Sequence, residues 1–127
     1  MAEGFLRDLT RGTVDVYSAG THPSYVHPLA IQVMKEAGID ISHHVSKSVH
    51  EFVDRKFDWV ITVCDDAMEI CPVFPGARKT VHLPFEDPVM FNGDMPARLA
   101  RFRLVRDEIR DRMEQFVRTE LPGCELI

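Results

Sequence analysis

The apolar residues of this chain recur at helical spacing in three stretches. In each stretch hydrophobic side chains return every three or four positions, which is typical of a helix that buries one face. Gly12 and Gly38 stand shortly after the first two stretches, where helices commonly end, and Pro28 stands where the second begins. The pattern predicts helices over residues 2–10, 29–37 and 96–119.

Three other stretches have the pattern of strands. Residues 57–63 are almost unbroken in apolar character, which is typical of a strand covered on both faces in a parallel sheet. Residues 80–83 form a second, shorter apolar run, and residues 14–18 alternate from one face to the other. Between these elements we expect a loop over residues 39–49, followed by a short helix near residues 49–53.

Strands that alternate with helices predict an α/β fold with a parallel sheet, because each crossover between parallel strands passes through a helix. The expected architecture is a three-layer sandwich around a small sheet. A chain of 127 residues, of which 45% are hydrophobic, is long enough for one compact core. We therefore expect residues 1–127 to form a single domain.

Composition narrows the classes of partner. The net charge of -5 argues against nucleic acid, since phosphate backbones recruit clustered Lys and Arg. The arginines of residues 98–112 are interleaved with acids, which indicates a solvated helix face. There is no apolar run of membrane-spanning length and no signal peptide, and three cysteines fit a reducing compartment. The sequence predicts a soluble cytoplasmic protein that binds neither nucleic acid nor membranes.

The candidate chemistry lies at the ends of two predicted strands. Cys64 directly follows the strand over residues 57–63, and Asp87 follows the strand over residues 80–83. In parallel sheets reactive groups gather at the carboxyl ends of the strands, so both residues are expected in one site. Each alone has an ordinary explanation: a thiol at a strand end is more often packing, and an Asp before Pro commonly forms a turn.

Cys71 makes a pair with Cys64. If the intervening residues are helical, the two α-carbons lie roughly 10 Å apart, whereas a disulfide needs them within about 7 Å. Oxidation would then unwind the segment, and Pro72 favours an extended Cys71. Zinc ligation is disfavoured, because the pair lacks the short spacing of zinc knuckles. The neighbouring His43 and His44 are interpreted as a solvated loop and Cys124 as a free tail thiol, so no metal site is predicted.

These motifs, with the opening Met1-Ala2-Glu3-Gly4-Phe5-Leu6 and the Tyr17-Ser18-Ala19-Gly20-Thr21 segment, resemble the thioredoxin-coupled arsenate reductases, which share the low-molecular-weight protein tyrosine phosphatase fold. The resemblance implies that a thiolate in a Cys-x5-Arg phosphate loop attacks arsenate. Cys64 then attacks the adduct and releases arsenite, Cys71 resolves the resulting disulfide, and thioredoxin reduces the Cys64–Cys71 bond from outside, with no bound cofactor. Asp87 matches the general acid.

Three departures from the resembled family matter. Phosphatases of this fold commonly place tyrosines after the Asp-Pro, whereas this chain has Val89, Met90 and Phe91, which favours arsenate over phosphotyrosine. Some of the reductases bind potassium near the first helix. Glu3 and Ser18 fit that site, but Lys47 stands where an acidic ligand is expected, so no potassium is predicted.

The third departure is the phosphate loop. The resembled family has its first strand and its Cys-x5-Arg loop just before the Met-Ala-Glu-Gly motif, and here neither Cys64 nor Cys71 is followed six positions later by arginine. We expect this chain to lack the first strand, to bind an arsenate-like or phosphate-like oxyanion only if the loop is restored, and to be inactive alone. A misassigned translation start is the simplest cause.

The expected loss of a central strand has a structural consequence, because open strand edges seek partners. We expect re-pairing of the remaining strands, dimerisation through them, or poor stability. Two other functions remain open: a low-molecular-weight protein tyrosine phosphatase once the loop is restored, and a non-catalytic redox or interaction module in which the cysteine pair cycles with thioredoxin.

Overall fold

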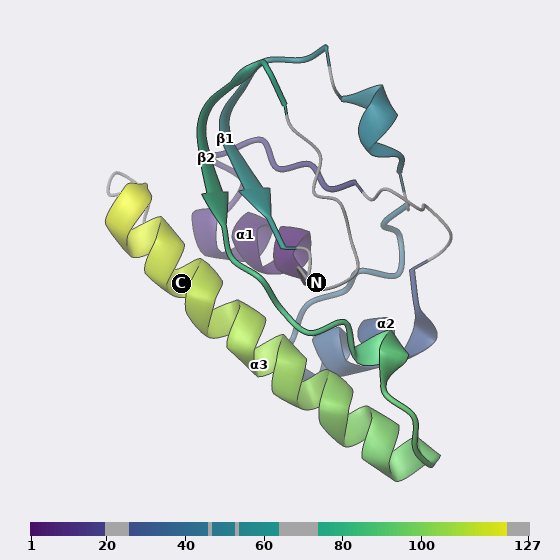
Figure 1. Cartoon of the computed structure of the whole chain (residues 1–127). Helices are drawn as coiled ribbons and strands as arrows, with labels where there is room; N and C mark the ends of the chain where they lie inside the picture. Colours follow the sequence, from purple (N-terminus) through teal and green to yellow (C-terminus); the bar gives the residue numbers. More distant parts are fainter. Residues whose placement is uncertain (20–25, 46, 53, 64–73, 122–127) are drawn as a thin grey trace.

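The structure, a computed structural model, describes residues 1–19, 26–45, 47–52, 54–63 and 74–121. The elements in chain order are helix α1 (Ala2–Thr10), helix α2 (Pro28–Glu36), the short 3-10 helix η1 (Val49–Glu51), strand β1 (Phe57–Thr62), strand β2 (Ala77–His82), the 3-10 helix η2 (Pro88–Met90) and helix α3 (Met95–Glu120). Helix α3 runs along one side of the molecule, with the strands near its C-terminal half and α2 beside its N-terminal half (Figure 1).

The three predicted helices are confirmed to within a residue or two. Their ends follow from local chemistry: the side chain of His27 accepts a hydrogen bond from the Leu29 amide at the start of α2, and Asp94 does the same for α3. Gly38, just beyond α2, has φ 84°, a left-handed conformation that side chains disfavour. The 3-10 helix η2 was not predicted from the sequence.

The sheet of the described residues consists of β1 and β2, which pair in parallel with Phe57 opposite Ala77 and Thr62 opposite His82. The predicted α/β fold with a small parallel sheet is therefore confirmed. Strand β2 begins three residues earlier than predicted, because Gly76 lets the backbone before β2 approach the backbone before β1 closely. A β-carbon at Gly76 would lie 2.4 Å from the backbone oxygen of Arg55.

The prediction that residues 57–63 are covered on both faces is wrong. No residue of β1 is fully buried, and Asp58 on its second face is exposed. The physical reason is that the described sheet has two strands, so each of them is an edge. One face, carrying Trp59, Ile61 and Val81, packs on the helical core, while β2 presents exposed Arg78, Lys79, Thr80 and His82.

The strand predicted over residues 14–18 is also wrong, since these residues form an irregular segment (Figure 1). A strand is stabilised by hydrogen bonds to a neighbouring strand. Here the carbonyl of Val16 accepts a hydrogen bond from the guanidinium of Arg7 in α1 instead. The Val16 side chain is nevertheless buried, so the apolar pattern located a buried residue without a strand.

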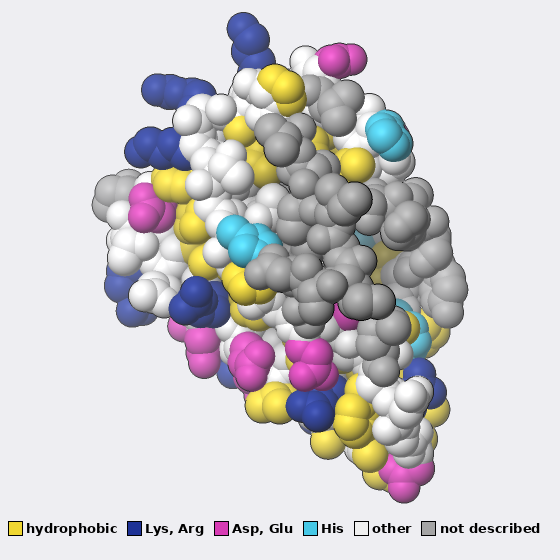
Figure 2. Space-filling model, in the orientation of Figure 1, with side chains coloured by type: hydrophobic (Ala, Val, Ile, Leu, Met, Phe, Trp, Pro, Cys, Tyr) yellow, Lys and Arg dark blue, Asp and Glu magenta, His cyan; other side chains and the backbone are white. Residues whose placement is uncertain are grey.

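The core lies between the helices. Met34, Phe102 and Met113 are almost completely buried, and α1 and α2 both pack against α3. The edge-on ring of Trp59 lies with its centroid 5.1 Å from that of Phe116, which joins the sheet to this core. The surface is charged but mixed: Figure 2 shows acidic and basic side chains side by side over α3. No helix among the described residues is long and apolar enough to cross a membrane.

Candidate functional site

Asp87, the predicted general acid, lies on the loop that leaves the carboxyl end of β2. Its side chain caps η2 by accepting a hydrogen bond from the Val89 amide at 3.0 Å, and Pro88 beside it is buried. The Asp-Pro pair thus forms the turn that its sequence predicts. Asp87 itself remains exposed to solvent.

A cavity of about 280 Å³ lies next to Asp87. It is bounded by α1, the segment after α1, the start of α2, the loop after Ile41, the segment around Asp87 and Phe102 of α3, so six separate parts of the chain meet there. The polar and charged side chains of its wall are Glu3, Ser18, His27, His44, Lys47 and Asp87. Two carboxylates, two imidazoles, a hydroxyl and an ammonium group thus share the wall of one small cavity.

Glu3 is the best-connected group of this wall. Its carboxylate accepts hydrogen bonds from the Ser18 hydroxyl and from Arg7 Nε at 2.9 Å, and it is almost completely buried. Burial, the largest single influence, raises the pKa of Glu3. The hydrogen bonds from Ser18 and Arg7, with the nearby charges of His44 and Arg7, outweigh it and hold that pKa below its ordinary value. Glu3 is therefore a fixed negative charge, and the prediction that potassium does not bind beside it stays a prediction.

The interpretation of both histidines as a solvated loop is half wrong. His43 is exposed, but the side chain of His44 is only 16% exposed and its Nδ1 lies 3.7 Å from Glu3 Oε2. Burial lowers the pKa of His44, and the charge of Glu3 opposes that shift. This contact could not be predicted from the sequence, because Glu3 and His44 lie far apart along the chain. Among the described residues there is no group of three or more His, Cys, Asp or Glu able to hold a metal ion.

The loop around Asp87 is held by a residue that the sequence pattern had assigned to a solvated helix face. Arg101 of α3 lies with its Nε 3.2 Å from Glu86 Oε2, and its guanidinium carbon lies 4.7 Å from the centroid of the Phe91 ring. Phe91 is consequently turned toward α3, whereas Val89 lines the cavity. The aromatic residue that follows the Asp-Pro is therefore not part of the cavity wall.

The cysteines Cys64, Cys71 and Cys124 lie outside the described residues. Strand β1 ends at Thr62, just before Cys64. The predicted meeting of Cys64 and Asp87 in one site, the proposed relay and the tail thiol all stay predictions.

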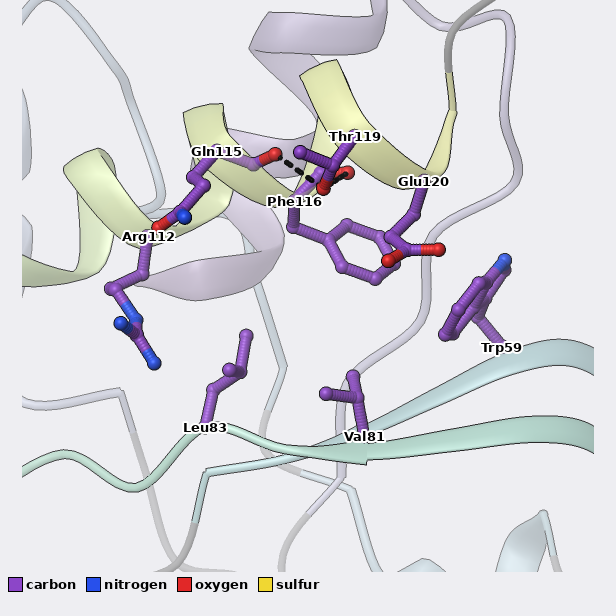
Figure 3. Close-up of a pocket in the computed structure, with 8 residues that line it drawn as sticks. All are labelled: Trp59, Val81, Leu83, Arg112, Gln115, Phe116, Thr119 and Glu120. Atoms are coloured by element: carbon purple, nitrogen blue, oxygen red, sulfur yellow. Dashed lines mark hydrogen bonds between the residues drawn. The ribbon is translucent and has the colours of Figure 1, made fainter.

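A second cavity, of about 170 Å³, lies between the sheet and the C-terminal half of α3 (Figure 3). Trp59, Val81 and Leu83 form its sheet side, and Arg112 and Glu120 are among the α3 residues opposite. The Thr119 hydroxyl, also on α3, donates a hydrogen bond to the Gln115 carbonyl at 2.9 Å. Of the predicted site residues, only Asp87 is among those that the structure describes, and it does not line this cavity.

Several known proteins resemble this chain in sequence and structure. The family model of the low molecular weight phosphotyrosine protein phosphatases matches residues 1–122. The arsenate reductase of Halalkalibacterium halodurans is 40% identical over 119 residues, which cover 94% of this chain and 86% of that protein. The arsenate reductase of Bacillus subtilis is 38% identical with the same coverage.

A solved structure described as an arsenate reductase in the phosphate binding state superposes with a TM-score of 0.76 at 33% identity, over 92% of this chain and 85% of that one. The residues that the family model matches include the described cavity wall and the Asp87 loop. On this evidence the chain belongs to the low molecular weight phosphotyrosine protein phosphatase family.

Proposed function

We propose that this chain is the thiol-relay and proton-donor part of an arsenate reductase of its family. Asp87 is the proposed general acid, and Cys64 and Cys71 are the proposed relay thiols. The observation that carries the proposal is that Asp87 borders a cavity of about 280 Å³, together with Lys47 and His44, in a chain 40% identical to an arsenate reductase. No bound cofactor is required, because thioredoxin supplies the electrons.

The proposed chemistry balances as follows. A nucleophilic thiolate bonds to arsenic(V) while one arsenate oxygen leaves, and Asp87 donates the proton that makes it water. The Cys64 thiolate attacks the sulfur of that adduct, and the electron pair of the broken S–As bond reduces arsenic to the +3 state, which leaves as arsenite. Cys71 attacks Cys64 in the disulfide formed by that step and displaces the nucleophilic thiolate. A thioredoxin dithiol then reduces the Cys64–Cys71 disulfide while becoming a disulfide itself.

No cysteine of this sequence stands in the kind of oxyanion-binding loop that activates the first nucleophile. An oxyanion cradle needs converging backbone amides and an arginine that closes the ring, and no cysteine of this sequence has arginine six positions later. We therefore propose that these residues relay electrons but do not by themselves turn over arsenate. An oxyanion would bind in the cavity once a Cys-x5-Arg loop completes it.

The relay is tested on the chain as it is. The protein is oxidised, and its reduction by thioredoxin, thioredoxin reductase and NADPH is followed by NADPH absorbance and by mass spectrometry of alkylated thiols. Reduction is expected for the wild type and for the matched control Cys124→Ser, and not for Cys64→Ser or Cys71→Ser. If either of these two variants accepts electrons as the wild type does, the relay is refuted.

The second arm tests whether these residues turn over arsenate without a Cys-x5-Arg loop. Arsenate added to the reduced chain is expected to cause no NADPH consumption above that of a Cys64→Ser, Cys71→Ser double variant. Turnover above that control would refute the proposed inactivity. After a strand and a Cys-x5-Arg loop are joined before Met1, arsenate consumption is expected to require thioredoxin, Cys64 and Cys71.

A phosphatase is the second candidate, because the family model is that of phosphotyrosine phosphatases. The residues after the Asp-Pro argue against it: Val89 lines the cavity, while Phe91 is stacked under Arg101. Hydrolysis of p-nitrophenyl phosphate by the restored protein, without thioredoxin and without loss in Cys64→Ser, would establish the phosphatase instead. Loss of both activities with an intact disulfide cycle would leave a redox or interaction module.

The sheet edge supports a proposal about assembly. Among the described residues β1 pairs with β2 alone, so its other edge has no strand beside it. We propose that this chain, as one domain in the reducing cytoplasm, dimerises through that edge. Light scattering over a range of concentrations is expected to show a dimer, and a monomer at all concentrations would contradict this.

A further inference from the structure

The loop that carries Asp87 is fixed to α3 by one side chain, Arg101. The Nε of Arg101 lies 3.2 Å from Glu86, the residue before Asp87, and its guanidinium carbon lies 4.7 Å from the centroid of the Phe91 ring, just after η2. Both contacts of one guanidinium thus flank the short turn in which Asp87 binds the Val89 amide at 3.0 Å. The turn is closed at its two ends by the same group.

Arginine suits this position for geometric reasons. Its planar guanidinium can meet a carboxylate in its plane while its face lies on an aromatic ring, which a lysine ammonium cannot do in the same way. The backbone that carries Arg101 is held firmly, because the next residue, Phe102, is 1% exposed in the core. Arg101 therefore transfers the position of the rigid helix to the loop.

The contacts are too exposed to matter much for global stability. The side chains of Arg101 and Glu86 are 34% and 45% exposed, and ion pairs of this kind contribute little to folding. Their effect is expected to be local, on the ordering of the turn between them. A neighbouring pair on the same helix, Arg110 with Asp107 at 3.3 Å, has similar exposure, but both of its members lie within α3.

We propose that Arg101 is a positioning residue for Asp87, which it acts on through Glu86 and Phe91. The functional meaning rests on the proposed role of Asp87 as proton donor, whereas the ordering of the turn does not. The pairing also keeps Phe91 on α3 and leaves Val89 at the cavity. A single α3 side chain thus sets both the place of the acid and the shape of the wall beside it.

The test measures amide hydrogen exchange by nuclear magnetic resonance on the whole chain. In Arg101→Ala the Val89 amide, which donates to Asp87, is expected to exchange about five- to tenfold faster, while the amides of Phe102 and Val105 keep their rates. The matched control Arg110→Ala is expected to leave Val89 unchanged. Arg101→Lys, which keeps a charge but loses the planar fork, is expected to restore protection only in part.

Two further variants keep the proposal falsifiable if Arg101→Ala destabilises the whole chain. Glu86→Gln and Phe91→Leu each remove one of the two contacts and are expected to accelerate Val89 exchange by less than Arg101→Ala does. The proposal is overturned if Val89 exchange is unchanged in Arg101→Ala, or if Val89 and the core amides accelerate alike. Because the readout uses neither arsenate nor thioredoxin, its failure is distinguishable from failure of the proposed relay.

Discussion

The helical half of this protein is more deeply buried than its sheet half. Phe102 and Met113 of α3 are 1% and 0% exposed, whereas no residue of β1 is fully buried and most of β2 is exposed. A helix closes its hydrogen bonds within one segment and needs only a neighbour for its apolar stripe, but a strand needs a second strand beside it. The helices therefore hold most of the buried core of the described residues, whereas the sheet is more exposed.

The largest effect is expected in the helical half. Met113→Ala should lower the free energy of unfolding by about 2–5 kcal/mol, because a fully buried side chain is lost and a cavity remains. Leu104→Ala, on the same helix but 49% exposed, is the matched control and should change it by less than about 0.5 kcal/mol. Urea denaturation followed by circular dichroism measures both. Equal losses would show that α3 is not the centre of the core.

The next effect contrasts a glycine of each half. Gly76→Ala should cost about 1–3 kcal/mol, because its β-carbon would meet the Arg55 backbone oxygen at 2.4 Å where the strands begin. Gly4→Ala, inside α1, meets side-chain atoms of Ile41 and Met34 at 3.0 and 3.1 Å, and alanine favours the helix by about 1 kcal/mol. Its net change should be near zero. A larger loss for Gly4→Ala in the same denaturation assay would reverse the comparison.

The same contrast explains what the sequence could reveal. Periodicity and end signals predicted α1, α2 and α3 because a helix is determined by residues close in sequence, such as Pro28 and Gly38. The strand expected at residues 14–18 did not form, because pairing depends on what lies beside it in space. Asp87 was predicted as a site residue from its place after β2 and from the family resemblance, and its role stays a prediction. The contacts of Arg101 and His44 were not predicted, since their partners Glu86 and Glu3 are brought to them only by the folded chain.

A smaller effect, of about 1 kcal/mol, is expected from the charge cluster at the cavity. The pKa of Glu3 is below its ordinary value of 4.5, so its contribution to stability is complete above that pH and is lost as the pH falls through the lower folded value. The pKa of His44 is below 6.5, so the unfolded chain takes up a proton first, and stability also falls as the pH drops below 6.5.

Thermal unfolding between about pH 3 and pH 8 separates the two groups. Glu3→Gln should flatten the loss of stability below pH 4.5, and His44→Gln should flatten the loss that begins below pH 6.5. Curves for both variants that run parallel to the wild type would mean that neither group titrates differently in the folded chain.

The smallest effect concerns surface ion pairs, and here too the halves should differ. The carboxylate of Glu36 in α2 accepts hydrogen bonds from Arg103 Nε and Nη2, at 2.9 and 2.8 Å, and from Arg106 Nη1 at 3.1 Å. The hydrogen bond from Arg103 is the main reason that the pKa of Glu36 lies below its ordinary value. Across the strands, Asp58 and Arg78 make one contact at 3.4 Å, with side chains 84% and 80% exposed. Solvent screening and the loss of side-chain entropy reduce the stabilisation from a bidentate pair in a network less than that from a single exposed contact.

Double-mutant cycles measured by urea denaturation test this difference. The coupling between Glu36 and Arg103 should be measurable and should shrink as salt is raised, because charges at the surface are screened. The coupling between Asp58 and Arg78 should be indistinguishable from zero at every salt concentration. If the Asp58–Arg78 pair coupled as strongly as the Glu36–Arg103 pair, surface ion pairs would stabilise the sheet in addition to its strand hydrogen bonds and its packing on α3. The contrast between the helical half and the sheet half would then be wrong.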